Sequence, residues 1–416
     1  MTELDLGLKV GARRLFWAMG LSTRLDVQLR GFSPPPAPGK GRARAPESFT
    51  DLDVLGVSVA DGYNVRTSIA DCKTSAKEST SRMFWVSGVA ALFGADHAYL
   101  VREHDVTDAA RQLSTRLGVT VLTADDLGRT QAFYGDALPA ADGPLGLLFD
   151  RAHAAAHLAA FNALDRKLKP LLDFREFDFW VIDQHRAPVQ LVAHLTAAKM
   201  RLDPRDPAHA ALFLDLSWLC LLSMIRVTEH VRSAYLSDPD RGLQEYLFGG
   251  APGLREKQET ARLLQSLAPP DTGPLDHLPA YYPQLRELAV RLLRRPRQMQ
   301  SALRYLEVAS ALSAAKRAEP LEGVFGPPAF DALAAKLAAD VCGFLVAAAD
   351  LDGGFRLRAR GYLLDEPVPV KAPPAQPEGG QPAPEASADT GNDSDTAATL
   401  SGLLPGMETS APLLDG

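Results

Sequence analysis

Two neighbouring apolar segments carry the residues whose types and spacing could do chemistry. Asp51 and Asp53 lie in the first, and Asp71 and Lys73 lie in the second (FTDLDVLGVSV, 49–59, and YNVRTSIADCK, 63–73). Both segments are predicted strands, separated by a turn signal around Asp61, and side chains alternate between the two faces of a strand. A hairpin centred on Asp61 would place Asp51 opposite Asp71 and bring all four groups to one face.

Three carboxylates at such close range would repel one another at neutral pH, and a divalent cation relieves that repulsion. Hard oxygen ligands suit Mg²⁺ or Mn²⁺. Lys73 would point to the same place, where it could orient a water molecule or stabilise negative charge on a phosphate. The alternative is that these acids lie at a solvent-exposed sheet end. Because aspartate is depleted in strands, we favour the metal site.

The elements around these residues predict an α/β domain with a mixed central sheet flanked by helices. Apolar periodicity and turn signals predict helices at 6–21, 74–93 and 105–117, and strands at 49–59, 63–73, 97–102 and 119–123. The chain order is therefore a helix, two or three antiparallel strands, a helix, a strand, a helix and a strand.

At these residues the chain resembles a known family. The sequences TDLDVLG (50–56) and IADCKT (69–74) are similar to the motif of the PD-(D/E)XK nuclease superfamily, which has the restriction-endonuclease-like fold. The closest likeness is to Mrr-like restriction enzymes and archaeal Holliday-junction resolvases. Residues 105–127 resemble the closing helix and strand of that family, so the resemblance covers residues 1–127, as a nuclease domain.

The resemblance implies roles for individual residues. Asp53 and Asp71 would hold the metal, with the carbonyl oxygen of Cys72 as a third ligand, and Lys73 would be the motif lysine. A further acid of the motif maps onto Asp51, with Glu47 as the fallback. Two departures stand out: Asp replaces the commoner Glu in the triplet, and Leu52 replaces the expected proline. Helix N-termini favour anions, so the start of the following helix offers candidates to contact a scissile phosphate: Ser75, Lys77 and Arg82.

The remaining chain divides by composition. Residues 128–365 are rich in Ala and Leu and predict a mainly helical domain. Its most basic stretch, 285–316, could contact a nucleic-acid backbone or be ordinary helix surface, and Pro296 should break it into two helices. His153 and His157 are expected on a helix surface because no third metal ligand is evident. Residues 366–416 are rich in Pro, Gly, Asp and Glu, and we expect a disordered acidic tail.

Composition limits the location and the partners. The chain has 416 residues and a formal charge of −7, which does not indicate a nucleic-acid binder. However, residues 372–416 contain no Lys or Arg, so the tail inflates the acidity. Cys72, Cys220 and Cys342 are far apart, and no signal-peptide core precedes them, which favours a reducing, cytoplasmic location. The most apolar stretch, 210–225, is too short to span a bilayer, so we expect no membrane association.

The resemblance implies a metal-dependent nuclease that hydrolyses phosphodiester bonds, with DNA as the expected substrate. The role would lie in repair or in defence against foreign DNA. The helical domain would supply substrate recognition, regulation, or contacts with a protein partner or a second copy of the chain. The alternative is a non-catalytic nuclease-fold scaffold, or a helical adaptor in a protein complex in which the hairpin acids are incidental.

Overall fold

The computed structural model describes residues 3–31, 47–61, 63–75, 79–140, 143–269 and 277–366. Residues 1–368 form one compact unit, and the predicted boundary near residue 127 lies inside it, within helix α4 (Ala124–Ala132). Nearly all of the predicted disordered tail, 367–416, lies outside the described residues, as does Lys77.

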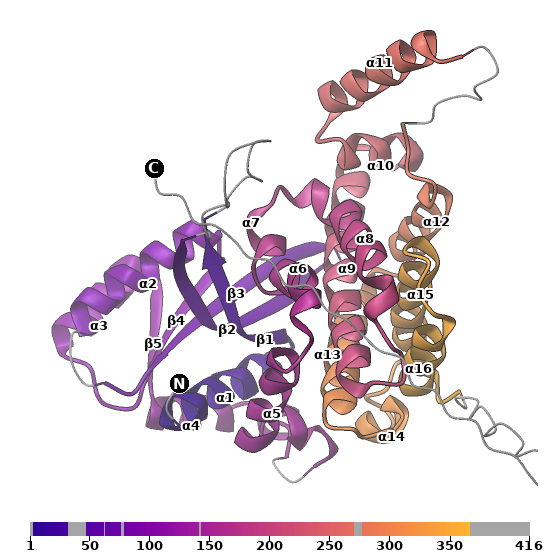
Figure 1. Cartoon of the computed structure of the whole chain (residues 1–416). Coiled ribbons are helices and arrows are strands. Elements are labelled where there is room, and N and C mark those ends of the chain that lie inside the picture. Colours follow the sequence, from indigo (N-terminus) through magenta and orange to yellow (C-terminus); the bar gives the residue numbers. More distant parts are fainter. Residues whose placement is uncertain are drawn as a thin grey trace, which may run out of the picture. The chain divides into compact units, whose positions relative to one another are not determined.

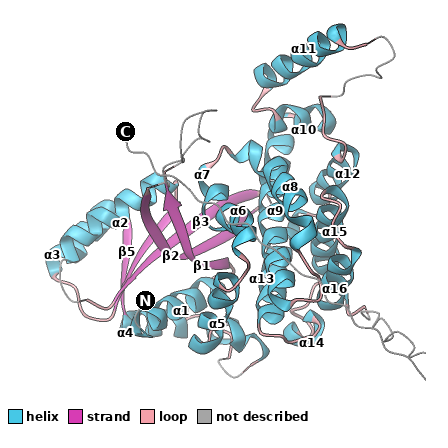
Figure 2. Ribbon diagram, viewed as in Figure 1, coloured by secondary structure: helices cyan, strands magenta, loops and turns pink. Residues whose placement is uncertain are grey.

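A five-stranded mixed sheet forms the N-terminal part, in the strand order β1-β2-β3-β4-β5, as Figures 1 and 2 show. The first three strands are antiparallel, and β3, β4 and β5 are parallel. Their bounds are β1 Ser22–Arg30, β2 Ser48–Ala60, β3 Asn64–Lys73, β4 His97–Arg102 and β5 Val119–Thr123. The predicted α/β class and mixed sheet are confirmed, and β1 is a strand to which the sequence analysis gave no residue range.

Helices cover both faces of this sheet (Figure 1). Helix α1 (Glu3–Ala18) and α4 lie on one face, where residues of α1 pack against even-numbered strand positions such as Val54 and Ala70. Helices α2 (Ser79–Phe93) and α3 (Asp108–Leu117) lie on the other face, where α2 contributes to the core with odd-numbered positions such as Leu55 and Ile69. The period-two alternation of the strands therefore supplies two apolar faces.

The hairpin register differs from the predicted one. Val54 pairs with Ala70, and Ala60 pairs with Asn64, so the connection is centred one residue beyond Asp61. Continuing this register brings Asp53, rather than Asp51, opposite Asp71. The predicted pairing of Asp51 with Asp71 is therefore wrong by two residues. A shift of two residues preserves the alternation of side chains between the two faces, whereas a shift of one would have reversed it.

The rest of the chain is mainly helical, as predicted, and packs around one long helix, α9 (Pro207–Ala234). In the part of the chain that is described, α9 alone has the length and composition to cross a membrane, but 94% of its apolar window is buried inside the protein. Such burial marks α9 as a core helix. The other helices are α5 Arg151–Asn162, α6 Lys169–Asp173, a π-helix Phe174–Asp178, α7 Phe179–Val181, α8 Ala187–Ala198, α10 Pro239–Leu247, α11 Ala251–Leu267, α12 Tyr282–Leu293, α13 Met299–Ala314, α14 Leu321–Phe325, α15 Ala332–Ala348 and α16 Gly353–Leu364.

Buried polar groups join the sheet to these helices. Glu307 of α13 accepts hydrogen bonds from Arg13 of α1 at 2.9 Å and from the backbone N–H of Thr23 in β1 at 2.7 Å. Arg24 of β1 forms an ion pair with Asp215 of α9. Because removing one partner from a buried ion pair is costly, these contacts fix how the helices sit against β1.

Candidate metal centre

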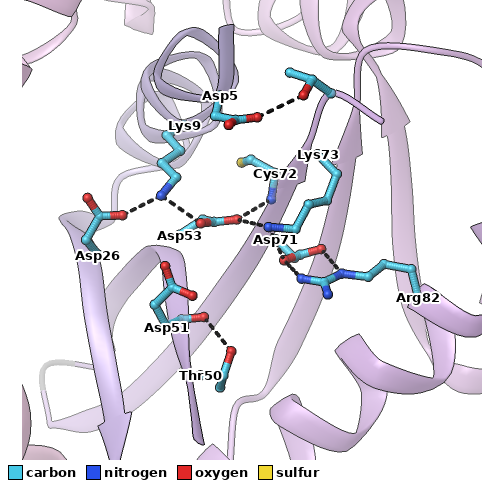
Figure 3. Close-up of polar contacts among 11 residues, drawn as sticks. Asp5, Lys9, Asp26, Thr50, Asp51, Asp53, Asp71, Cys72, Lys73 and Arg82 are labelled. Carbon is cyan, nitrogen blue, oxygen red and sulfur yellow. Dashed lines mark hydrogen bonds and ion pairs between the residues drawn. The ribbon is translucent and has the colours of Figure 1, made fainter. Parts of the chain in front are cut away.

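The structure brings Asp53, Asp71 and Lys73 together at one end of the sheet (Figure 3). Asp53 lies in β2, and Asp71 and Lys73 lie near the end of the neighbouring strand β3. The Lys73 Nζ atom is 3.5 Å from Asp53 Oδ2 and 3.5 Å from Asp71 Oδ1. Lys73 is 38% exposed, whereas the two carboxylates are almost fully buried. One ammonium group therefore approaches both acids from the solvent side.

Asp53 has two further partners. The backbone N–H of Cys72 donates a hydrogen bond to its Oδ2 atom at 2.7 Å, and the Lys9 Nζ atom lies 2.7 Å from its Oδ1 atom. Lys9 comes from α1 and also binds Asp26 of β1. These two contacts come from different elements, β3 and α1, and hold the Asp53 carboxylate in one orientation.

Arg82 binds Asp71 through both carboxylate oxygens, with Nε 2.7 Å from Oδ2. This arginine extends from α2 and lies over the ring of Trp85, its Cζ atom 3.5 Å from the ring centroid. From the sequence, Arg82 is a candidate for phosphate contact. In the structure its guanidinium contacts Asp71, a two-pronged geometry that is among the stronger ion pairs.

Asp51 lies beside Asp53 on the other side of the centre. It is exposed, and its carboxylate has no ion-pair partner in the described part of the chain. Oxygens of Asp26, Asp51 and Asp53 all lie within 4.8 Å of one another. Among the described residues, these three acids form the group whose spacing suits a cation. Asp71 does not belong to this group. Glu47 is exposed at the start of β2 and is outside this group as well.

Lys9 and Asp26 are site residues that were not predicted from the sequence, although each has an unusual feature there. Lys9 lies in a helix between the apolar residues Leu6 and Val10, where a solvated lysine is out of place. Asp26 lies in a strand and has a positive φ of 54°, a conformation that Asp tolerates better than most residues. An aspartate inside a strand is the same anomaly that drew attention to Asp51 and Asp53.

Burial and charge oppose each other in this centre. Burial disfavours the charged form of Lys9, but Asp53 and Asp26 outweigh it and raise the lysine's pKa. Burial raises the pKa of Asp26, and the ion pair with Lys9 only partly offsets that effect. Burial, reinforced by Asp53 and Asp71, also raises the pKa of the Cys72 thiol well above its usual value. The Cys72 side chain is therefore a neutral thiol, and only its carbonyl remains a predicted ligand.

The donor set fits a hard divalent cation. Carboxylate oxygens are the ligands that Mg²⁺ and Mn²⁺ prefer, and oxygens within 4.8 Å of one another can converge on one such ion. Two resident cations compete for the same oxygens, because Lys9 binds Asp53 and Arg82 binds both oxygens of Asp71. A metal held by Asp53 and Asp71 together would require Arg82 to release at least one oxygen.

A pocket of about 260 Å³ opens beside the acids. Lys9, Asp26 and Asp51 line one side, and α5 and the π-helix supply the other side through residues that include Asn162 and Arg175. The helical part of the chain therefore forms part of the surroundings of the candidate centre.

Comparison of the chain with protein-family models, with curated proteins and with solved structures found no match in any of the three.

Proposed function

We propose that the protein is a metal-dependent nuclease whose N-terminal part is a restriction-endonuclease-like domain. The observation that carries this proposal is the position of Lys73 Nζ, 3.5 Å from an oxygen of both Asp53 and Asp71. An acid on one strand, and an acid and a lysine on the next, are what the resemblance implies. The element order of helix, three antiparallel strands, helix and strand supports it further.

Asp53 would hold the metal together with Asp71, or together with Asp51 and Asp26 on its other side. Bound there, Mg²⁺ or Mn²⁺ would lower the pKa of a coordinated water molecule and neutralise charge on the phosphate. The remaining roles belong to the chain itself. Lys9 and the Cys72 N–H fix the direction of the Asp53 carboxylate. Lys73 is exposed enough to place its ammonium near a bound phosphate or water.

In this proposal Arg82 balances the charge of Asp71 and does not take part in catalysis directly. Its guanidinium neutralises Asp71 in the absence of other cations, so it keeps the two buried carboxylates from repelling each other. When a substrate phosphate approaches, the same guanidinium could transfer to the phosphate, because arginine binds carboxylate and phosphate with the same fork of donors.

DNA is the proposed substrate because most of the resembling families act on DNA. The role in repair or defence, the cytoplasmic location and a protein partner or homodimer formed through the helical part belong to the same proposal. They follow from the resemblance and the composition.

The test is incubation of the full-length protein with plasmid, linear duplex, single-stranded DNA and RNA, each with Mg²⁺, with Mn²⁺ or with EDTA. We expect cleavage with either cation and none with EDTA. Comparison of the substrates shows whether DNA or RNA is cleaved, and whether cleavage needs a free end or occurs at internal sites. Absence of cleavage for every substrate under every condition would refute the nuclease assignment.

A specific observation favours the alternative of a non-catalytic scaffold. Both proposed metal ligands already have cationic partners, since Lys9 pairs with Asp53 and Arg82 pairs with Asp71. On this reading, the charges only tie α1 and α2 to the sheet. Titration with Mn²⁺ distinguishes the two readings, because a scaffold predicts no saturable binding that depends on Asp53.

A further inference from the structure

We propose that the 260 Å³ pocket beside Asp51 binds one unstacked nucleobase, so that the strand entering this centre is single-stranded or locally opened. This inference rests on the proposed nuclease function and names its substrate class. A base in this pocket would leave its own backbone next to Asp51 and Asp53, where the phosphodiester has to lie.

The position of the pocket is the first argument. Lys9, Asp26 and Asp51 line the pocket, and the same three residues belong to the candidate metal centre or contact it directly. Pocket and centre therefore share a wall. A group bound in the pocket would therefore lie against Asp26 and Asp51.

Charge decides which part of a nucleotide fits. The lining has three carboxylates, Asp26, Asp51 and Glu176, against two cations. Both cations are already paired, because Lys9 binds Asp26 and Asp53, and Arg175 binds Asp215 and lies 3.6 Å from Glu176. A phosphate inside the pocket would meet a net negative lining without a free cation in the described part of that lining. A neutral base avoids this repulsion.

The polar groups of the lining suit the edge of a base. Gln28 and Asn162 are amides, which both donate and accept hydrogen bonds. The Gln28 Oε1 atom accepts from Arg30 Nε at 3.1 Å, so its NH₂ group is the part left to donate. Carboxylates of the lining accept hydrogen bonds from the amino and ring N–H groups of bases. Enzymes that extract a base read it by such contacts to its edge.

The apolar groups and the size fit the flat face of one base. Leu25 and Leu158 line the pocket together with the Arg175 guanidinium, which covers the buried ring of Phe161 at 3.9 Å from the ring centroid. Apolar side chains and guanidinium planes are surfaces on which unstacked bases pack. A volume of about 260 Å³ is below the usual range for drug-sized ligands. It leaves room for a single base and excludes a base pair.

The far wall of the pocket is held by buried ion pairs. Arg175 and Glu176 belong to the π-helix Phe174–Asp178, and π-helical turns occur often at functional sites. Asp215 of α9 binds Arg175 and also Arg24 of β1, and all three are buried or nearly so. The pocket thus gives the helical part of the chain a role at the centre, namely to recognise the strand that enters it.

The test is a binding measurement on full-length protein carrying Asp71→Asn, with Ca²⁺ present, so that affinity is measured apart from cleavage. Fluorescence anisotropy compares a short single strand, the same strand with one abasic position, and the duplex. Leu158→Trp fills the pocket and Asn162→Ala removes an exposed amide. Ala156→Trp is the matched control, because Ala156 is exposed on the same helix and does not line the pocket.

We expect single strands to bind at least tenfold more tightly than duplex, and Leu158→Trp to lose about tenfold of that affinity. Asn162→Ala should reduce the affinity for the single strand by a smaller factor, and Ala156→Trp should not change it. The abasic position is moved along the strand in a series of oligonucleotides. At one position, the abasic strand should bind the protein without pocket substitutions as weakly as the intact strand binds Leu158→Trp. Circular dichroism checks that the variants fold. If Leu158→Trp does not fold, Asn162→Ala still tests the pocket.

Equal binding of duplex and single strand, unchanged affinity in both pocket variants, or no binding of any oligonucleotide would overturn the inference. If a free nucleoside monophosphate competed as strongly as an unlabelled single strand, the ligand would be a nucleotide and not a strand. The outcomes for the nuclease proposal are distinct. A cleavage rate that is unchanged by Leu158→Trp refutes only the pocket inference. Binding that depends on the pocket, without cleavage by the unsubstituted protein, refutes only the nuclease proposal.

Discussion

Arg82 binds both carboxylate oxygens of Asp71, the residue for which the sequence predicts metal coordination. The pair joins α2 to the end of β3, and the guanidinium also lies over Trp85. A metal ion held by Asp71, as proposed, would have to compete with Arg82 for these two oxygens.

Replacing Arg82 by Met should strengthen Mn²⁺ binding by about tenfold, because a charge-assisted hydrogen bond of about 1.5–3 kcal/mol no longer opposes coordination. Isothermal titration calorimetry on the full-length protein measures the affinity. Arg255→Met, an exposed change on α11, is the control and should leave the affinity as it is. An affinity that stays the same or falls in Arg82→Met would show that Asp71 is not a metal ligand.

Lys9→Met should destabilise the protein by about 3–5 kcal/mol at neutral pH, because it leaves Asp26 and Asp53 without their buried cation. Burial raises the pKa of Asp26, and an acid whose folded pKa is raised loses stability as pH rises through that value. The deficit of the variant should therefore shrink as pH falls from neutral towards the ordinary pKa of an aspartate, about 3.9. Urea unfolding across this pH range measures it.

Lys257→Met on exposed α11 is the matched control for Lys9→Met and should cost almost nothing. The double variant Lys9→Met with Asp53→Asn should recover part of the loss, since it removes one of the two buried charges that lose Lys9, leaving Lys73 to pair with Asp71. If Lys9→Met were as stable as the control at neutral pH, the ion pairs would not hold the centre together.

His157 should make the folded protein sensitive to mild acid. Burial lowers its pKa to about 3, and Arg13 adds to the effect. A base with a lowered folded pKa loses stability as pH falls below its unfolded value, which is about 6.5 for His. From pH 7 to pH 5 this amounts to about 2 kcal/mol.

His157→Asn should reduce that loss, and the free energy of unfolding over this pH range is the measurement. His153, exposed and paired with Asp150, provides the control variant His153→Asn. If both variants kept the acid sensitivity of the unsubstituted protein, His157 would not titrate in the buried network as the contacts imply.

Most elements of the sheet region could be predicted, because alternation and turn residues are local signals. Strands β2 to β5 begin and end within a few residues of the expected positions, and Pro296 separates α12 from α13 as expected. The register of the hairpin was predicted less accurately than these bounds, because it depends on how the turn closes. Tyr63 N–H bonds the Ala60 carbonyl, so the turn centre lies beyond Asp61.

The partners of the site residues were beyond local reasoning. Lys9 and Asp26 lie 44 and 27 residues from Asp53 in sequence. The packing of α1 on the sheet brings Lys9 to Asp53, and the pairing of β1 with β2 brings Asp26 to it. His157 was expected on a helix surface, but it is half-buried and lies within hydrogen-bond reach of Ser310, at 3.4 Å. The expectation was wrong because the helix packs against α13, which period-based reasoning on one helix cannot reveal.

The most direct test of the proposed chemistry is the Mn²⁺-dependent cleavage rate of the protein with Asp71→Asn and with Lys73→Ala, each against the unsubstituted chain. Lys257→Ala, exposed on α11, is the control for loss of a lysine. We predict that both site variants lose at least a hundredfold in rate, while the control keeps the full rate. Cleavage at an undiminished rate in either site variant would contradict the assignment of Asp53, Asp71 and Lys73 as the catalytic centre.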